Sequence, residues 1–252
     1  MSSTEIKDSQ IIFLDEVDST NRYAKDHFAE LPDGTLVTAE RQTAGRGRQG
    51  RTWISPSGEN IYASWIMKQP HDLYLSTAAG SLAVLDTLRE YAPDQSFFLK
   101  WPNDVYAGNC KICGILTESV LGPGYAVEGV VVGLGININS EMEIFEGLPP
   151  AASLYTLTGK RFSLKNITFS LAKNLLTCYI TYLNNPDELF DRWKTENRLI
   201  GQELEFEPAY GEPFRAIFRD VLRSGEAVLE TSRGLEQFTC GDVRILKDSI
   251  KF

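Results

Sequence analysis

Residues 43–53 are rich in arginine and glycine and separate two runs that look like β-strands. The segment carries Arg46, Arg48 and Arg51 together with three glycines, in a chain whose formal net charge is -9. Glycine lets backbone amides approach a ligand closely, and arginine offers a fixed fork of donors suited to phosphate and carboxylate oxygens. The alternatives are a solvated surface turn and an RGG-like nucleic-acid segment. RGG segments are usually long, repeated and basic, whereas this motif occurs once and ends in Trp53, so the pattern favours an anion-binding loop.

Composition places the chain among ordinary folded proteins. With 252 residues, of which 42% are hydrophobic and 23% charged, it is long enough for one large domain, or for a large and a small one. The acidic balance argues against a general binder of nucleic acid or anionic membranes. No apolar run approaches the ~20 residues of a membrane helix, and residues 1–8 lack the apolar centre of a signal peptide. We therefore expect a cytoplasmic protein without membrane attachment.

Hydrophobic periodicity predicts alternating strands and helices over the first four fifths of the chain. Strands are expected at residues 11–14, 35–40, 60–67, 97–100, 111–118 and 125–139, and helices at 20–28, 75–91, 151–157, 163–183 and 186–196. The first strand is expected to be buried. The helix at 163–183 is expected to bury Ile167, Leu171, Leu175 and Ile180.

Polar residues stand at two of the predicted element ends. Ser19 or Thr20 suits a helix cap, and the start of a helix can also hold a polar ligand group. Pro102 stops the strand at 97–100, so Asn103 and Asp104 are expected at a strand end, where functional groups are often presented. Asp104 is then either a turn former or a magnesium ligand.

Lys111 opens a strand that follows a hairpin turn at 108–109. Strict alternation places it on the same face as Cys113 and Ile115. A lysine among apolar neighbours needs a partner, such as a bound carboxylate or phosphate, unless its long stem reaches water. Both interpretations remain open for Lys111.

Glycines leave one face of the strand at 125–139 with few side chains. Gly133, Gly135 and Asn137 share that face, which is therefore stripped of side chains and could support a flat ligand. A dinucleotide-binding Gly-x-Gly is the competing interpretation. It is weak because the third glycine and the following helix are missing.

The last fifty residues change character. Five short β-like runs follow residue 203, which predicts a small barrel, and we place the domain boundary between residues 1–198 and 199–252. Four cysteines include the C-x-x-C pair Cys110 and Cys113, but neither a second close pair nor a histidine pair completes a zinc site. We expect reduced thiols, with Cys113 packed in its strand, over a redox pair.

The motifs combine into a recognisable set. They are Gly45-Arg46-Gly47-Arg48-Gln49-Gly50-Arg51-Thr52-Trp53, Lys100-Trp101-Pro102-Asn103-Asp104, Lys111 with Gly114-Ile115-Leu116, and Gly133-Leu134-Gly135-Ile136-Asn137. In this order they resemble the biotin protein ligases (biotin-[acetyl-CoA-carboxylase] ligases) over nearly the whole chain. The resemblance implies an α+β fold with a mixed sheet flanked by helices, related to class II aminoacyl-tRNA synthetases, and an SH3-like C-terminal barrel.

The resemblance also implies an ATP-dependent ligase. Biotin and MgATP would give biotinyl-5′-AMP and pyrophosphate, and a lysine of a biotin carboxyl carrier protein would then accept the biotinyl group. The substrates would be ATP and biotin, with Mg²⁺, and the chain would be a monomer or a homodimer. Some members carry an N-terminal winged helix. With about ten residues before its first strand, this chain resembles the monofunctional type, so no DNA partner is expected.

Roles follow by motif position. Catalytic roles are implied for Lys111, Arg48 and Asp104, the last also as a metal ligand. Contacts with biotin and ATP are implied for Ser19, Thr20, Asn21, Gln42, Gly45, Arg46, Gly47, Arg48, Arg51, Trp53, Lys100, Asn103, Lys111, Gly114, Gly133, Gly135 and Asn137. In this scheme the residues around Ser19 and Gln42 hold biotin, Trp53 borders adenine, and Gly133 and Gly135 form the pocket floor. Asn103 and Asp104 serve the metal or the incoming lysine.

Two alternative functions remain open at this point. Lipoate and octanoate protein ligases are expected to share this fold but lack the Gly-Arg-Gly-Arg spacing. The second alternative is a non-enzymatic adaptor that binds phosphate or nucleotide, and such a protein would form no adenylate.

Overall fold

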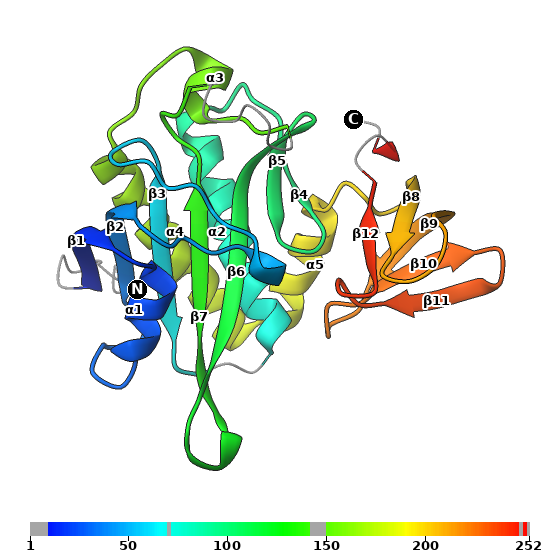
Figure 1. The fold of residues 1–252 in the computed structure, drawn as a ribbon, viewed down its shortest axis with the longest axis horizontal. Helices are drawn as coiled ribbons and strands as arrows, with labels where there is room; N and C mark the ends of the chain where they lie inside the picture. Colours follow the sequence, from blue (N-terminus) through cyan, green and yellow to red (C-terminus); the bar gives the residue numbers. More distant parts are fainter. Residues whose placement is uncertain (1–9, 70–71, 142–149, 247–248, 251–252) are drawn as a thin grey trace.

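The computed structural model describes residues 10–69, 72–141, 150–246 and 249–250, and it contains two β-sheets (Figure 1). The larger is a seven-stranded mixed sheet in the order β1-β2-β3-β7-β6-β5-β4, and the smaller is a five-stranded sheet in the order β11-β10-β9-β8-β12. The predicted α+β class is confirmed. Residues 1–8, on which the expectation about a signal peptide rested, lie outside the described residues.

The elements follow the predicted alternation, except that the strand at residues 104–107 was not predicted. The larger sheet is built from β1 (Ile11–Val17), β2 (Leu36–Gln42), β3 (Ile61–Met67), β4 (Phe97–Lys100), β5 (Asp104–Ala107), β6 (Cys110–Leu121) and β7 (Val127–Ile136). The helices are α1 (Thr20–Asp26), α2 (Leu73–Tyr91), α3 (Leu154–Thr158), α4 (Leu164–Asn184) and α5 (Pro186–Glu196). The smaller sheet is built from β8 (Glu203–Pro208), β9 (Phe214–Val221), β10 (Ala227–Thr231), β11 (Gly234–Phe238) and β12 (Val243–Ile245).

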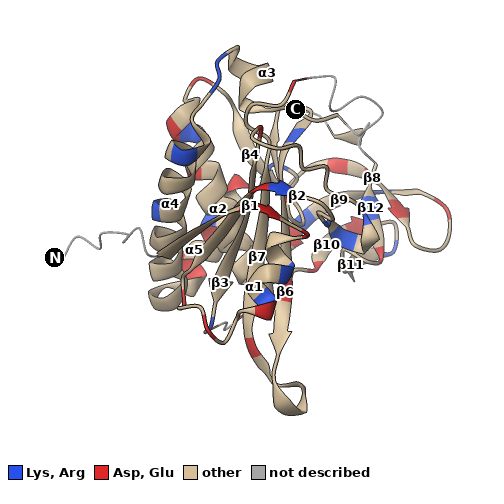
Figure 2. Cartoon of the chain, turned by 60° about the vertical axis from the view of Figure 1, so that its left-hand side comes forward, with Lys and Arg blue, Asp and Glu red and all other residues tan. Residues whose placement is uncertain are grey.

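The two faces of the larger sheet differ. Helix α2 packs on one face, where a methyl group at Gly80 would meet Val132 of β7, and α4 and α5 pack against α2. Every residue of β3 is buried, and in Figure 2 this strand is tan along its length while acidic and basic residues are interspersed elsewhere. The opposite face carries α1 and the Arg/Gly segment, so it is the face left for a ligand. No helix in the described part of the chain has the length and apolar character needed to cross a membrane.

Two predicted burial patterns were wrong. Strand β1 lies at the edge of the sheet, and there Phe13 is 52% exposed although its ring contacts Phe169 of α4. In α4, Ile180 is 44% exposed, and the helix instead buries Cys178, Tyr179 and Tyr182. The apolar surface of a helix follows its 3.6-residue period, and the step of five residues from Leu175 to Ile180 departs from it.

Polar contacts attach the smaller sheet to the larger one. The Trp101 indole donates to the carbonyl of Gly225 over 2.9 Å, and Arg223 pairs with Asp72 and Asp187 at 3.0 and 2.7 Å. These contacts join β9–β10 to the beginning of α2 and α5. They make the smaller sheet a fixed neighbour of the ligand face. The domain boundary at residues 198 and 199 remains a prediction.

Candidate functional site

A cavity of about 1270 Å³ lies between the Arg/Gly segment, the glycine face of β6 and β7, and the smaller sheet. All residues predicted to contact ligand line it, with the exception of Gly45. At Gly45 a methyl group would stand 2.5 Å from the Trp53 carbonyl oxygen. The glycine there allows a close backbone crossing, and its contact with the ligand stays a prediction.

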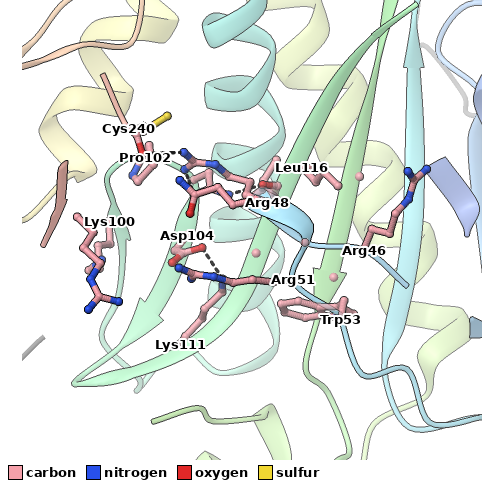
Figure 3. A pocket seen from close by; sticks show the side chains of 18 of the residues that line it. Arg46, Arg48, Arg51, Trp53, Lys100, Pro102, Asp104, Lys111, Leu116 and Cys240 are labelled. Atoms are coloured by element: carbon pink, nitrogen blue, oxygen red, sulfur yellow. Dashed lines mark hydrogen bonds and ion pairs between the residues drawn. The ribbon is translucent and has the colours of Figure 1, made fainter. Parts of the chain in front are cut away.

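The Arg/Gly segment folds into a small hairpin. Arg46 and Thr52 form an antiparallel bridge, and the Gly47 amide donates to the Arg51 carbonyl over 2.7 Å. At its turn, Gln49 and Gly50 both have left-handed backbones, with φ of 54° and 73°. Arg51 points toward Asp104 and Lys111, and Arg48 points toward Pro102 and Cys240, whereas Arg46 points to the other side of the hairpin (Figure 3).

Arg48 is held by two different parts of the chain. Its Nη1 donates to Asn103 Oδ1 over 2.9 Å, and its Nη2 donates to the carbonyl of Cys240 over 3.4 Å (Figure 3). Asn103 is itself fixed, because its Nδ2 donates to the carbonyl of Ile115 in β6. Asn103 therefore orients an arginine of the hairpin, a contact that no prediction assigned to it.

Lys111 faces the cavity, contrary to the predicted alternation. Its Nζ forms an ion pair with Asp104 Oδ1 at 2.6 Å and lies 5.4 Å from the centre of the Trp53 ring. The pairing of β5 with β6 shifts register after Val105, which leaves Ile112 as an extra residue in β6. This bulge turns Lys111 onto the face of Gly114, away from Cys113 and Ile115.

Trp53 lies on the glycine face. A methyl group at Gly135 would stand 2.4 Å from its ring, and one at Gly114 would stand 3.0 Å from it. Gly114 and Gly135 are directly paired across β6 and β7, so the indole packs on the backbone of these two glycines. The predicted bare floor is therefore covered by a protein side chain here. The indole N–H is buried without a partner among the described residues, which leaves a donor for a ligand.

A neutral hydrogen-bonded network forms the other end of the cavity. Gln42 Oε1 accepts from the amide and the hydroxyl of Thr20, at 2.9 and 3.1 Å. Asn21 Nδ2 donates to the Leu116 carbonyl, and Ser64 Oγ lies within bonding distance of both Thr20 and Asn21. Ser19 occupies the cap position of α1, as predicted, but makes no capping bond with its side chain.

Two more predicted residues reach the cavity from strand ends. Lys100 is 8% exposed and stands 5.3 Å from the centre of the Tyr106 ring. Asn137 donates through Nδ2 to the carbonyl of Ala152 over 3.1 Å, at the end of β7. Both line the cavity wall.

The residues around Asp104 do not fit a metal ion that the protein itself holds. Mg²⁺ and Ca²⁺ require several oxygen ligands, and no cluster of three or more His, Cys, Asp or Glu occurs within the described ranges. The Asp104 carboxylate already contacts the Lys111 ammonium. The cysteines are free, and burial raises the pKa of the Cys113 thiol far above its ordinary value, so it is an inert core residue as expected.

Sequence reasoning missed the wall that the smaller sheet contributes. The cavity is also lined there by Glu207, Pro208, Ala209, Gly211, Pro213, Cys240, Gly241, Val243, Arg244, Ile245 and Leu246. The segments have no ligand-binding motif. The contact between Arg48 and Cys240 joins this wall to the hairpin, and it depends on how the two sheets pack.

Comparisons with known proteins agree on the kind of protein that this chain resembles. Residues 13–137 match the Biotin/lipoate A/B protein ligase family. A biotin--[acetyl-CoA-carboxylase] ligase of Mycobacterium tuberculosis is 33% identical over 84% of this chain and 79% of that protein. The bifunctional ligase/repressor BirA of Bacillus spizizenii is 29% identical over 96% of this chain and 76% of that protein. A biotin protein ligase from Aquifex aeolicus, solved in complex with biotin and ATP, superposes with a TM-score of 0.78 at 28% identity, covering 94% of this chain and 98% of that one.

Proposed function

Because the chain belongs to the biotin protein ligases, within the biotin/lipoate A/B protein ligase family, we propose that its cavity joins biotin to ATP and passes the biotinyl group to a lysine of a carrier protein. The acceptor would be the biotin carboxyl carrier domain of an acetyl-CoA carboxylase, in keeping with the name of the mycobacterial relative.

The observation that carries this proposal is the chemical contrast between the two ends of one cavity. Lys111, Arg48 and Arg51 gather at one end, and the uncharged groups of Thr20, Asn21 and Gln42 form the other. A polyphosphate needs the cationic end, and the ring urea of biotin needs neutral donors and acceptors. At about 1270 Å³ the cavity is larger than the usual site for one small ligand, so it accommodates both.

The first step is adenylation. A carboxylate oxygen of biotin attacks the α-phosphorus of ATP, the new O–P bond forms, and the bond from the α-phosphorus to the bridging oxygen breaks to release pyrophosphate. Two anions must approach, so the main barrier that the protein can lower is electrostatic. Lys111 supplies a positive charge at the reacting oxygens, while Asp104 fixes the position of its Nζ.

The second step is aminolysis of the mixed anhydride. The neutral amine of the carrier lysine attacks the acyl carbon, the C–O bond to AMP breaks, and the amine gives up a proton as the amide forms. Arg48, held by Asn103 and the Cys240 carbonyl, stays beside the leaving AMP. In this assignment Asn103 and Asp104 position the two cations.

Magnesium enters this scheme as part of the substrate MgATP. Its charge offsets the phosphates, and its ligands come from the phosphate oxygens and water in place of a protein-held set. We place the reaction in the cytoplasm, a reducing compartment in which the four free cysteines would remain thiols.

Biotin-dependent exchange of labelled pyrophosphate into ATP tests the proposal. The purified protein should catalyse exchange with biotin and should show little exchange with lipoate at the same concentration. Absence of exchange with biotin, or a preference for lipoate, would overturn the assignment.

A further inference from the structure

An ion pair stands behind the neutral end of the cavity without lining it. Glu118 of β6 and Lys25 of α1 approach to 2.6 Å, and their side chains are 23% and 28% exposed. Neither residue belongs to the cavity wall. Any effect of this pair on a ligand must therefore pass through a residue between them and the cavity.

Asn21 is that residue. Its Nδ2 donates to Glu118 Oε2 over 2.8 Å and to the Leu116 carbonyl over 3.1 Å, and its Oδ1 lies 2.6 Å from Ser64 Oγ. Asn21 is 4% exposed, and its carboxamide lies against Gly133, where a methyl group would stand 2.3 Å from Oδ1. Both amide hydrogens are thus used within the protein. Asn21 can offer a ligand only the remaining lone pair of Oδ1.

Glu118 favours one of the two possible orientations of the Asn21 carboxamide. If the carboxamide turned over, its oxygen would face the Glu118 carboxylate and the Leu116 carbonyl, which are acceptors. A bond to a charged acceptor is about twice as strong as a neutral one, so the carboxylate dominates the choice. Burial alone raises the pKa of Glu118, but hydrogen bonds from Lys25 and Asn21, with the charges of Lys25 and Arg46, lower it overall below its ordinary value. Glu118 is therefore ionised at neutral pH.

We propose that Glu118, held by Lys25, is a positioning residue that fixes the Asn21 oxygen toward the cavity, so that this end of the site selects a ligand with an N–H donor. The inference rests on the proposed function, because the ring urea of biotin supplies such N–H groups. It adds two residues, neither of them in the cavity wall, to the determinants of biotin recognition.

Exchanging the two charges separates two roles of Glu118, which are to position Asn21 and to attach α1 to β6 through Lys25. In the double variant Lys25→Glu/Glu118→Lys the ion pair is retained, but residue 118 can no longer accept a bond from Asn21. We expect the swap to recover most of the thermal stability lost by Glu118→Lys alone, while the biotin Kd from titration calorimetry stays on the order of 10-fold above wild type. A swap that restores wild-type biotin affinity would overturn the proposal.

A gentler variant keeps the test decisive if the lysine variants fail to fold. Glu118→Gln preserves shape and removes the charge, which frees Asn21 to turn. The probes are biotin and its two cyclic carbamate analogues, each with one ring N–H replaced by oxygen. Wild type should discriminate against at least one carbamate, and Glu118→Gln should reduce that discrimination by roughly 10-fold. If Glu118→Gln discriminates between biotin and the carbamates as well as wild type does, Glu118 has no positioning role.

Glu230→Gln is the matched control, since Glu230 pairs with Arg219 at 2.5 Å on the smaller sheet and does not line the cavity. It should leave both the biotin Kd and the discrimination at wild-type values. A wild-type protein that binds no biotin at all would remove the proposed function and this inference together. Normal wild-type binding with unaltered variants would remove the inference alone.

Discussion

At the scale of single residues, the site depends on side chains whose positions are fixed by unexpected neighbours. Lys111 reaches the cavity because a bulge at Ile112 turns it, and Asp104 then holds its Nζ at 2.6 Å. Trp53 rests on Gly114 and Gly135, and alternation predicted the ligand face for Gly135. The chemistry of each residue was readable from the sequence, but its partner was not.

Replacing Lys111 by alanine tests the central cation. The variant loses the positive charge beside the reacting oxygens, so biotin-dependent pyrophosphate exchange should slow by a factor on the order of 10² or more. Lys173→Ala is the matched control, because Lys173 is exposed on α4. An exchange rate within twofold of wild type for Lys111→Ala would exclude the electrostatic role.

Gly135→Ala tests the packing of Trp53 on Gly135. The added methyl would overlap the indole at 2.4 Å, and such overpacking should lower the free energy of unfolding by about 1–3 kcal/mol. Denaturant unfolding in a Trp53→Ala background should show a clearly smaller loss, because the clashing ring is gone. Gly241→Ala, whose methyl would stand 3.5 Å from Thr239 Oγ1, should be nearly neutral. Equal losses in both backgrounds would show that Trp53 does not occupy this position.

At the scale of elements, the Arg/Gly hairpin is the part best suited to respond to ligand. Three glycines between residues 45 and 50 make it costly to order, and its arginines repel one another until an anion arrives. Trypsin should cut rapidly after Arg46, Arg48 and Arg51 in the free protein. Biotin with MgATP should protect these bonds strongly, and biotin alone should protect them weakly.

Arg233 provides the internal control for this proteolysis, because it is 77% exposed on the smaller sheet and should be cut at the same rate in every sample. Peptide mapping by mass spectrometry gives the rate at each bond. Cleavage of the hairpin at equal rates with and without saturating ligands would rule out closure of the hairpin over the site.

The contact between α2 and α5 gives the fold a defined pH dependence. Arg89 donates to both oxygens of Glu196, each over 2.7 Å, and these bonds lower the pKa of Glu196 below its ordinary value near 4.5. A lowered pKa means that the pair stabilises the fold above the unfolded pKa and that this contribution disappears as pH falls through the folded pKa. Glu196→Gln should therefore cost about 1 kcal/mol at pH 7, since solvent screens a partly exposed pair. The difference in Tm from wild type should shrink below pH 4.5, and a difference that is constant with pH would contradict this role.

The elements were largely predictable because each depends on its own residues. The limits of α5, from Pro186 to Glu196, follow from a proline start and an apolar stripe, and the structure reproduces them. The exposure of Phe13 was not predictable, since it depends on which strand lies at the edge of the sheet. The face of Lys111 was also not predictable, because a bulge is a property of the paired strands. Gly45 shows the same limit, since its neighbour is a backbone segment eight residues further along the chain.

At the scale of the whole molecule, the cavity is complete only because the two sheets meet. Arg48 bridges them by donating to Asn103 on one side and to Cys240 on the other. The Trp101 bond to Gly225 and the ion pairs of Arg223 keep the smaller sheet in place. No local pattern encodes this wall, so sequence reasoning identified the motifs of the larger sheet and missed the residues opposite them.

In the proposed reaction biotin and ATP meet in this cavity, and the biotin carboxylate attacks the α-phosphorus. Heavy-oxygen labelling tests it most directly. Biotin labelled in its carboxylate with oxygen-18 is incubated with the protein, MgATP and a purified biotin carboxyl carrier domain, and the nucleotide product is analysed by mass spectrometry. We expect biotinylated carrier and AMP that carries one labelled oxygen, because aminolysis leaves the bridging oxygen on phosphorus. Unlabelled AMP, or ADP as the product, would contradict it.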